Sequence, residues 1–328
     1  MFVHLLLDGF AESSLSVALD IVATAAHLRD RGRAPTAGGA RALRQRLVSL
    51  SGAAVPSSVG RSTAVDGAFR VQSLGDGDVV LVPGIFAKPA LTVDQLLGRE
   101  DVHLAAQLLR RAAAKGATIA ASCSATFVLA VAGILDGRSA TTSWWLAPEF
   151  ARRFPQVALS SQQIVADEGQ VLTAGAALAH TDLTLTVLAR VVGPSLVHLV
   201  TRYLVIDPRP SQARYVVLER LRAEDPVLLD LERFVGMNMG RQIPMDELAR
   251  VARMSPRTLA RHMHRGVNMT PREFVHRLRV RRAVHLLETT RSSVDDIAAQ
   301  VGYADAAAFR RVFRRYAEDS PARIRARR

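Results

Sequence analysis

Cysteine, lysine and long apolar runs are all scarce in this sequence. Its 328 residues include one cysteine, so no disulfide can form within the chain. The first residues, Met1-Phe-Val-His, lack the basic stretch with which a secretory signal begins. The longest apolar runs, such as 125–135, are much shorter than the roughly 20 residues that a membrane-spanning helix needs. These absences predict a cytoplasmic protein without a transmembrane segment.

Every basic side chain except Lys88 and Lys115 is an arginine, and the formal net charge is +13. This balance favours a polyanionic partner, although an arginine-rich surface without any partner would explain the total equally well. The distribution is more informative, because residues 241–328 contain 20 arginines and only nine acidic residues. A basic C-terminal module beside a nearly neutral N-terminal one is typical of a nucleic-acid-binding domain attached to another domain.

The N-terminal two thirds alternate between strand-like and helix-like segments. Residues 2–7 are apolar, and apolar residues at helical spacing follow over 13–28. Two more apolar runs, 79–82 and 117–121, enclose a helical pattern over 102–114. This alternation predicts a largely parallel sheet covered by helices on both faces. The polar, glycine- and alanine-rich stretch 31–46 is predicted to be an exposed loop.

Small residues follow three of the predicted strands, at the edge where open α/β sheets bind ligands. These turns are Asp8-Gly9-Phe10, Pro83-Gly84-Ile85 and Ser122-Cys123-Ser124, and they could form one pocket. Cys123 lies between a strand and a helix, as the nucleophile does in a nucleophile elbow, where backbone amides lower the pKa of a thiol. Three roles remain open for Cys123: pocket wall, redox sensor and nucleophile, favoured in that order.

The segments "ASCSATFVLAVAGILDGRSATTSWW" (121–145) and "VLTAGAALAHTDLTL" (171–185), with "PGI" after a strand, resemble the DJ-1/PfpI domain of the GlxA-like transcription regulators. The resemblance implies a flavodoxin-like α/β fold of the class I glutamine-amidotransferase-like superfamily. In catalytic relatives of that superfamily the cysteine works with a histidine, often the next residue, and with an acidic side chain after the first strand.

Serines replace these groups here. Ser124 follows Cys123, Ser14 aligns with the acid, and Ser143 stands where the regulators commonly have histidine. A thiol without a base and an orienting acid lacks the proton acceptor that turnover needs, so we predict no catalytic residue. We also expect no metal ligand and no cofactor. The main alternative is a Cys123-dependent amidase or hydrolase fused to a DNA-binding domain. A domain that serves only oligomerisation is a further alternative.

Several residues are therefore candidates for the wall of a small-molecule pocket: Asp8, Ser14, Gly84, Ile85, Cys123, Ser124 and Ser143. Thr141, Thr142 and Trp144 either line this pocket or belong to the core. His180 is considered as another base and is predicted to be a helix cap or a surface residue. His4, inside an apolar strand, is predicted to be a hydrogen-bonded core residue.

Two prolines interrupt the helical pattern in "VIDPRPSQARY" (205–215) and mark a domain boundary. We predict an N-terminal domain over 1–206, a linker over 207–225 and a helical domain over 226–328. Within the last, 245–265 aligns with 294–315, at an offset of 49 residues that becomes 50 after one insertion. Each copy predicts a helix, a sharp turn and a second helix, which gives helix-turn-helix units at about 244–265 and 294–316.

The second helix of each copy has arginines on the side opposite its apolar anchors. Two helical hairpins in a bundle would not need them, whereas arginine binds guanine edges and phosphates in the major groove. The candidate DNA-binding residues are Ser255, Arg257, Arg261 and Arg265 in the first unit and Asp305, Arg310, Arg311 and Arg314 in the second. Further phosphate contacts are predicted from Arg277, Arg281, Arg282 and the tail 322–328.

The segment "VGYADAAAFRRVFRRYAEDSPARIR" (301–325) resembles the signature of the AraC/XylS family, with Gly302-Tyr303 in the turn and Ser320-Pro321 before the last helix. Ala317 replaces the usual glycine. The resemblance implies that helix 271–290 joins the two units, which can then enter major-groove faces about 34 Å apart. Both resemblances together imply a GlxA-like regulator that binds promoter DNA and a small-molecule effector. We expect it to form a homodimer.

Overall fold

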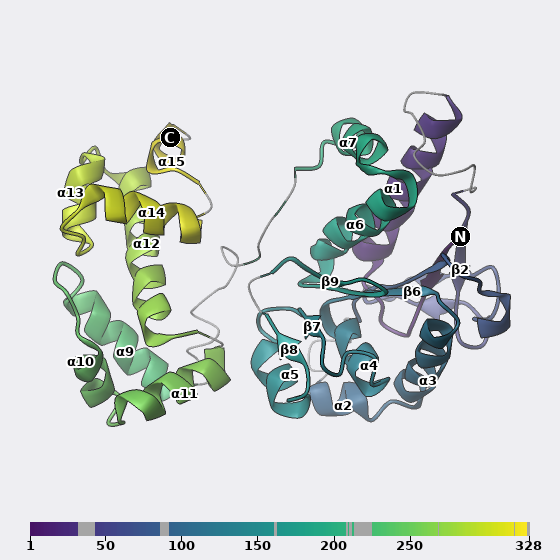
Figure 1. The fold of residues 1–328 in the computed structure, drawn as a ribbon, viewed down its shortest axis with the longest axis horizontal. Helices are drawn as coiled ribbons and strands as arrows, with labels where there is room; N and C mark the ends of the chain where they lie inside the picture. The colour runs from purple at the N-terminus through teal and green to yellow at the C-terminus, as the bar shows by residue number, and fades with distance from the viewer. Residues whose placement is uncertain are drawn as a thin grey trace. The chain divides into compact units, whose positions relative to one another are not determined.

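The computed structural model describes residues 1–31, 43–85, 92–160, 163–207, 209, 212, 225–267, 269–317 and 319–326. The chain divides into two compact units, Met1–Gln212 and Ala213–Arg328 (Figure 1). Of the predicted linker over 207–225, only Asp207, Arg209, Gln212 and Asp225 are among the described residues.

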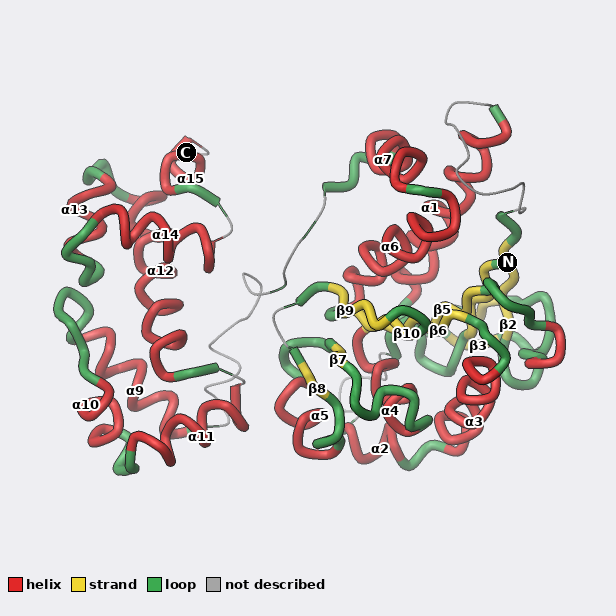
Figure 2. The backbone as a smooth tube through the Cα atoms, viewed as in Figure 1, coloured by secondary structure: helices red, strands yellow, loops and turns green. Residues whose placement is uncertain are grey.

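The N-terminal unit contains a six-stranded sheet of order β2-β1-β5-β6-β10-β9 (Figure 2). Neighbouring strands pair in parallel except β9, which is antiparallel to β10, so the predicted α/β fold class is confirmed. The strands are β1 (Phe2–Leu5), β2 (Gln45–Val48), β5 (Val79–Val82), β6 (Thr118–Ser122), β9 (Val165–Glu168) and β10 (Val171–Ala174). Strands β1, β5 and β6 lie side by side in the middle of the sheet, and their residues are buried on both faces of the sheet. Such central strands are typically continuous apolar runs.

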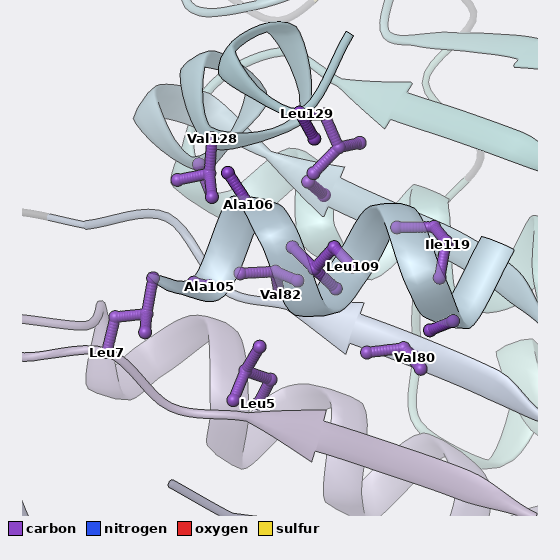
Figure 3. Packing of buried hydrophobic residues seen from close by; sticks show 14 of the residues in the cluster. Leu5, Leu7, Val80, Val82, Ala105, Ala106, Leu109, Ile119, Val128 and Leu129 are labelled. Carbon is purple, nitrogen blue, oxygen red and sulfur yellow. The ribbon is translucent and has the colours of Figure 1, made fainter. Parts of the chain in front are cut away.

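Helices cover both faces of this sheet (Figure 1). The helices α1 (Glu12–Asp30), α6 (His180–Val192) and α7 (Pro194–Tyr203) pack on one face around Leu81 and Leu172. The helices α3 (Glu100–Ala114) and α4 (Thr126–Val131) pack on the other, around the cluster that Figure 3 shows with Val80, Val82 and Leu109. The smaller elements are α2 (Val93–Leu97), α5 (Ala147–Arg153), β3 (Val55–Pro56), β4 (Ser62–Thr63), β7 (Ser139–Ala140), β8 (Ala158–Leu159), η1 (Val71–Ser73), η2 (Cys123–Ala125) and η3 (Ala177–Ala179).

Strand β2 corrects the prediction that 31–46 is an exposed loop. Gln45 and Arg46 belong to this strand, which pairs in parallel with β1, while residues 32–42 lie outside the described part of the chain. The strand lies at the sheet edge, and Gln45, Arg46 and Leu47 are only partly buried. An edge strand of this kind needs no continuous apolar run, so its sequence resembles that of a loop.

The C-terminal unit is helical and contains both predicted helix-turn-helix units. The first consists of α10 (Met245–Val251) and α11 (Pro256–Val267), and the second of α13 (Val294–Gln300) and α14 (Ala306–Ala317). Helix α12 (Pro271–Thr289) joins them, with α9 (Pro226–Met237) before the first unit and α15 (Pro321–Ala326) after the second. None of the helices in the described ranges is long and apolar enough to cross a bilayer.

Helix α12 contributes to two separate cores. Phe274 and Leu278 pack with the first helix-turn-helix unit, whereas Ala283 and Leu287 pack with the second. The helix begins with a capping box, in which the Thr270 side chain accepts from the Glu273 backbone amide and the Glu273 side chain accepts from that of Thr270. Because one continuous helix carries apolar residues of both cores, it fixes the spacing between the two units.

Candidate ligand pocket and DNA-binding surface

Cys123 lies at the turn between strand β6 and the helical segments η2 and α4. Its φ of 57° is in the left-handed region, which non-glycine residues seldom adopt. Two hydrogen bonds hold this backbone: Cys123 N donates to Gly175 O at 2.7 Å, and Thr142 Oγ1 donates to Cys123 O at 2.7 Å. The turn therefore has the strand, sharp bend and helix of a nucleophile elbow.

The environment of the thiol does not favour the thiolate. Cys123 is 1% exposed, and Ser143 Oγ donates to its sulfur at 2.9 Å. Burial raises the pKa of the Cys123 thiol, and this effect outweighs the hydrogen bonds from Ser143 and the backbone that oppose it. The prediction that the turn lowers this pKa is therefore wrong. A neutral thiol is a poor nucleophile.

Ser124 connects the elbow to the turn after β5 by two hydrogen bonds. Its hydroxyl donates to Ile85 O at 2.6 Å and accepts from Ile85 N at 2.8 Å. A Cβ on Gly84 would lie 2.7 Å from the Cys123 Cβ, so only glycine fits between these turns. The first turn also approaches, since Ala11 N donates to Gly84 O at 2.7 Å. The strand-end turns thus meet as expected, and Ser124 occupies the position of the missing histidine in a structural role.

Two further candidates differ in their relation to the thiol. Ser14 is buried, and its hydroxyl donates at 3.0 Å to the carbonyl of Ala177, whose backbone amide hydrogen-bonds to the thiol. The neutral hydroxyl of Ser14 is therefore linked to the thiol through the backbone of Ala177, at the position where catalytic relatives have an acid. Asp8 has an exposed side chain, and its backbone carbonyl accepts from Arg99 at 3.0 Å. The structure brings Ser14, but not the Asp8 carboxylate, to the elbow.

Two histidines of this unit, His4 and His180, are fully buried. His180 is fully buried at the start of α6 and shares a 2.9 Å hydrogen bond with Ser122 Oγ, so the prediction of a cap or surface residue is wrong. The helix packs this residue against the sheet, and burial lowers its pKa to about 3. His4 is in the core as predicted, hydrogen-bonded to Gln45 at 3.0 Å, and burial lowers its pKa to about 4. Both imidazoles are neutral at physiological pH.

Sequence reasoning missed Gln212, which it assigned to the linker. Gln212 is 2% exposed, and its Nε2 donates to Thr142 O at 2.9 Å and lies 3.2 Å from both Thr141 Oγ1 and Gln163 O. Thr141 and Thr142, proposed as pocket or core residues, are fully buried beside it. A polar residue after two prolines carries no sequence signal of burial, so only the tertiary structure identifies it.

In the first helix-turn-helix unit, Arg257 and Arg261 are exposed on α11, while Leu259 and Met263 are buried. Ser255 caps this helix, since its hydroxyl accepts from Thr258 N at 3.1 Å. The Arg265 side chain lies outside the described part of the chain. The described arginines thus lie on the solvent side of the helix, opposite its apolar anchors.

The second unit repeats this arrangement. Arg310, Arg311 and Arg314 are exposed on α14, and Phe309 and Phe313 are fully buried.

Asp305 begins that helix, because its carboxylate accepts from the backbone amides of Ala307 and Ala308, which lower its pKa. One arginine is also paired, since Arg310 lies 3.1 Å from Asp295. Ser255 and Asp305 are therefore helix caps, and their contact with DNA stays a prediction.

The arginines of α12 do not all suit phosphate binding. Arg277 is 7% exposed, and its guanidinium lies 5.5 Å from the centre of the Tyr316 ring. The prediction that it contacts phosphate is wrong because α12 packs on both sides and buries this position. Arg281 pairs with Glu232 at 2.6 Å, and Arg282 is exposed.

Comparisons with known proteins agree with this division of the chain. Residues 5–190 match the DJ-1/PfpI family, and residues 248–327 match a helix-turn-helix domain family. The chain is 31% identical over 235 residues to the HTH-type transcriptional regulator GlxA of Rhizobium meliloti, covering 69% of this chain and 71% of that protein. It is 29% identical over 286 residues to the HTH-type transcriptional regulator CdhR of Pseudomonas aeruginosa, covering 86% of this chain and 82% of that protein.

A solved structure is also similar in fold. The crystal structure of an AraC family transcriptional regulator from Pseudomonas putida superposes with a TM-score of 0.50 at 22% identity. The match covers 62% of this chain and 98% of that one.

Proposed function

Since this chain belongs to the AraC-type transcriptional regulators with an N-terminal DJ-1/PfpI domain, we propose that both helix-turn-helix units bind promoter DNA and that the N-terminal unit binds a small-molecule effector. The observation that carries this proposal is that the second helix of each helix-turn-helix unit has exposed arginines on its solvent side. Arg257 and Arg261 are exposed on α11, and Arg310, Arg311 and Arg314 are exposed on α14, in each case opposite buried anchors. Helices with this distribution suit the major groove, where arginine binds guanine edges and phosphates.

The N-terminal unit, in this proposal, binds its ligand without transforming it. The thiol is neutral and buried, and serines stand at the positions of the acid and the histidines. Nothing among the described contacts of Cys123 can remove its proton, which nucleophilic turnover requires. Effector binding changes DNA affinity only if the effector prefers one of two states of the protein, so the effector must have different affinities for them.

The proposed assembly is a homodimer, because two-fold symmetry doubles the DNA half-site that one chain contacts. Sedimentation of the full chain with and without DNA measures this directly. A chain that stays monomeric at the concentration of half-maximal DNA binding would contradict the dimer without affecting the DNA-binding proposal.

The test of DNA binding is selection of genomic fragments by the purified full chain, followed by affinity measurements on the selected fragment. The variant Arg257→Ala/Arg261→Ala should bind at least about tenfold more weakly, and removal of each arginine that binds a phosphate should reduce the salt slope by about one. The matched control is Arg110→Ala/Arg111→Ala, which removes the same charge from exposed positions on α3. No preference for any fragment over scrambled DNA, or equal losses of affinity in both variants, would refute the proposal.

A further inference from the structure

The N-terminal unit ends at Gln212, and the carboxamide of this residue is buried in the same unit. Three oxygens surround its nitrogen: Thr142 O at 2.9 Å, and Thr141 Oγ1 and Gln163 O at 3.2 Å. A carboxamide nitrogen has two hydrogens, and Thr141 Oγ1 itself donates to Gln163 O at 3.0 Å, so the nitrogen need not donate to all three oxygens. On its other side, Gln212 Oε1 is buried and has no hydrogen-bond partner among the residues that the structure describes. The nitrogen of the carboxamide is therefore satisfied, whereas its oxygen is not satisfied by any described residue.

Gly175 provides the space for this side chain. A Cβ at position 175 would lie 2.3 Å from Gln212 Oε1 and 2.7 Å from its Cδ, although the Gly175 backbone is not in the left-handed region. The carbonyl of Gly175 also accepts from Cys123 N, and Thr142 donates to Cys123 O. The carboxamide thus lies against the two residues that hold the backbone of the elbow cysteine.

A second contact fixes the same segment. Arg209 Nη2 donates to Asp182 Oδ2 at 2.5 Å and to Leu178 O at 2.6 Å, both in or beside α6. Arg209 and Gln212 are three residues apart, and the side chains of both make polar contacts within the N-terminal unit.

We propose that the carboxamide of Gln212 occupies the effector site, and that the effector is a small molecule whose primary ammonium or primary amide group takes its place. The three converging acceptors suit a nitrogen with two or three hydrogens, and an ammonium group satisfies all of them. Gln212 is the last residue of the N-terminal unit, so its displacement would change the chain at the point where that unit ends. The regulatory consequence rests on the proposed function, whereas the exchange of groups at this site does not.

The experiment uses the full chain and its intrinsic tryptophan fluorescence. Both tryptophans, Trp144 and Trp145, belong to the N-terminal unit and come directly after Thr142 and Ser143 in the sequence. Thermal melting followed by tryptophan fluorescence therefore reports on this unit. The probes are propionamide, propylammonium and N,N-dimethylpropionamide, the last of which has no N–H group. The variants are Gln212→Ala and, as a matched control, Gln170→Ala, whose carboxamide donates to Ala113 O and Ala117 O elsewhere in the unit.

The two N–H probes should stabilise Gln212→Ala at concentrations about tenfold or more below those that wild type requires, because a tethered group competes at an effective concentration of millimolar or above. Gln170→Ala should respond as wild type does, and the dimethyl probe should have no effect on any variant. Comparison of propionamide with propylammonium distinguishes amide from ammonium. Should Gln212→Ala fail to fold, Gln212→Asn, which withdraws the carboxamide by one methylene, replaces it.

Equal responses of Gln212→Ala and wild type, or an equal effect of the dimethyl probe, would overturn the proposal. The selection of genomic fragments by the full chain is unaffected by these outcomes. A chain that binds its promoter but fails the probe test therefore loses only the inference about Gln212, and a chain that binds the probes but no DNA loses only the proposed function.

Discussion

Replacement of Gly302 by alanine should destabilise the second helix-turn-helix unit by about 2–4 kcal/mol, because it adds both backbone strain and a collision. Gly302 has a φ of +83°, and its Cβ would lie 2.3 Å from the Met239 carbonyl oxygen and 2.6 Å from Arg279 Nη2. The left-handed backbone alone accounts for about 1–2 kcal/mol of this loss. The remainder comes from moving the Met239 backbone, which is less adaptable than the end of a side chain.

The first unit contains a natural control for this substitution. Arg253 lies 49 residues before Gly302, at the equivalent position of the repeat, and has a φ of 53°. Its side chain is exposed, so the turn there accommodates a Cβ. Arg253→Gly should change stability by no more than about 1 kcal/mol, because relief of backbone strain is offset by the greater freedom of glycine in the unfolded chain.

Hydrogen exchange of the full chain, resolved to peptides by mass spectrometry, measures both effects in the unit concerned. Gly302→Ala should accelerate exchange over 294–317, about tenfold for each 1.4 kcal/mol of stability removed, and leave the peptides of the sheet unchanged. Arg253→Gly should leave exchange over 245–267 close to that of wild type. Unchanged protection of 294–317 in Gly302→Ala would refute the assignment of strain and collision to this turn.

Two other predictions concern the N-terminal unit. Cys123→Ser should leave promoter affinity unchanged, since a neutral buried thiol is not needed for DNA binding. Iodoacetamide should label the folded wild type far more slowly than the unfolded chain at pH 8. Rapid labelling, or substrate turnover that the variant abolishes, would favour the enzyme alternative. Because burial lowers the pKa of His180 from 6.5 to about 3, the unfolded chain gains a proton first on acidification, so the stability of this unit should be complete above pH 6.5 and decline as the pH falls toward 3. His180→Asn should flatten this decline in tryptophan-monitored melting, and an unchanged pH profile would contradict the role of His180.

Local spacing accounts for what the sequence predicted well. The 49-residue repeat identified both helix-turn-helix units, because apolar anchors such as Leu259 and Phe309 must recur at fixed offsets in equivalent folds. The buried strands β1, β5 and β6 were likewise evident as short apolar runs. Edge strand β2 was not, since its residues are half exposed and need not be apolar.

Predictions that depended on tertiary burial were less successful. The pKa of Cys123 and the surroundings of His180 depend on elements distant in sequence that exclude water from them. Arg277 resembled its exposed neighbours in the sequence, because only the packing of Tyr316 against α12 distinguishes it. Gln212 was assigned to a linker because the prolines before it indicate a break in the helical pattern, and they do not indicate where the next side chain lies.

Helix α12, which supplies apolar residues to both cores of the C-terminal unit, also sets their angular phase. An α-helix has 3.6 residues per turn, so one residue inserted between Leu278 and Ala283 would rotate the second core by about 100° relative to the first. Such an insertion would rotate α14 relative to α11 without replacing any arginine. If both units bind DNA as proposed, the length of this helix sets the base-pair distance between the two segments of DNA that they contact.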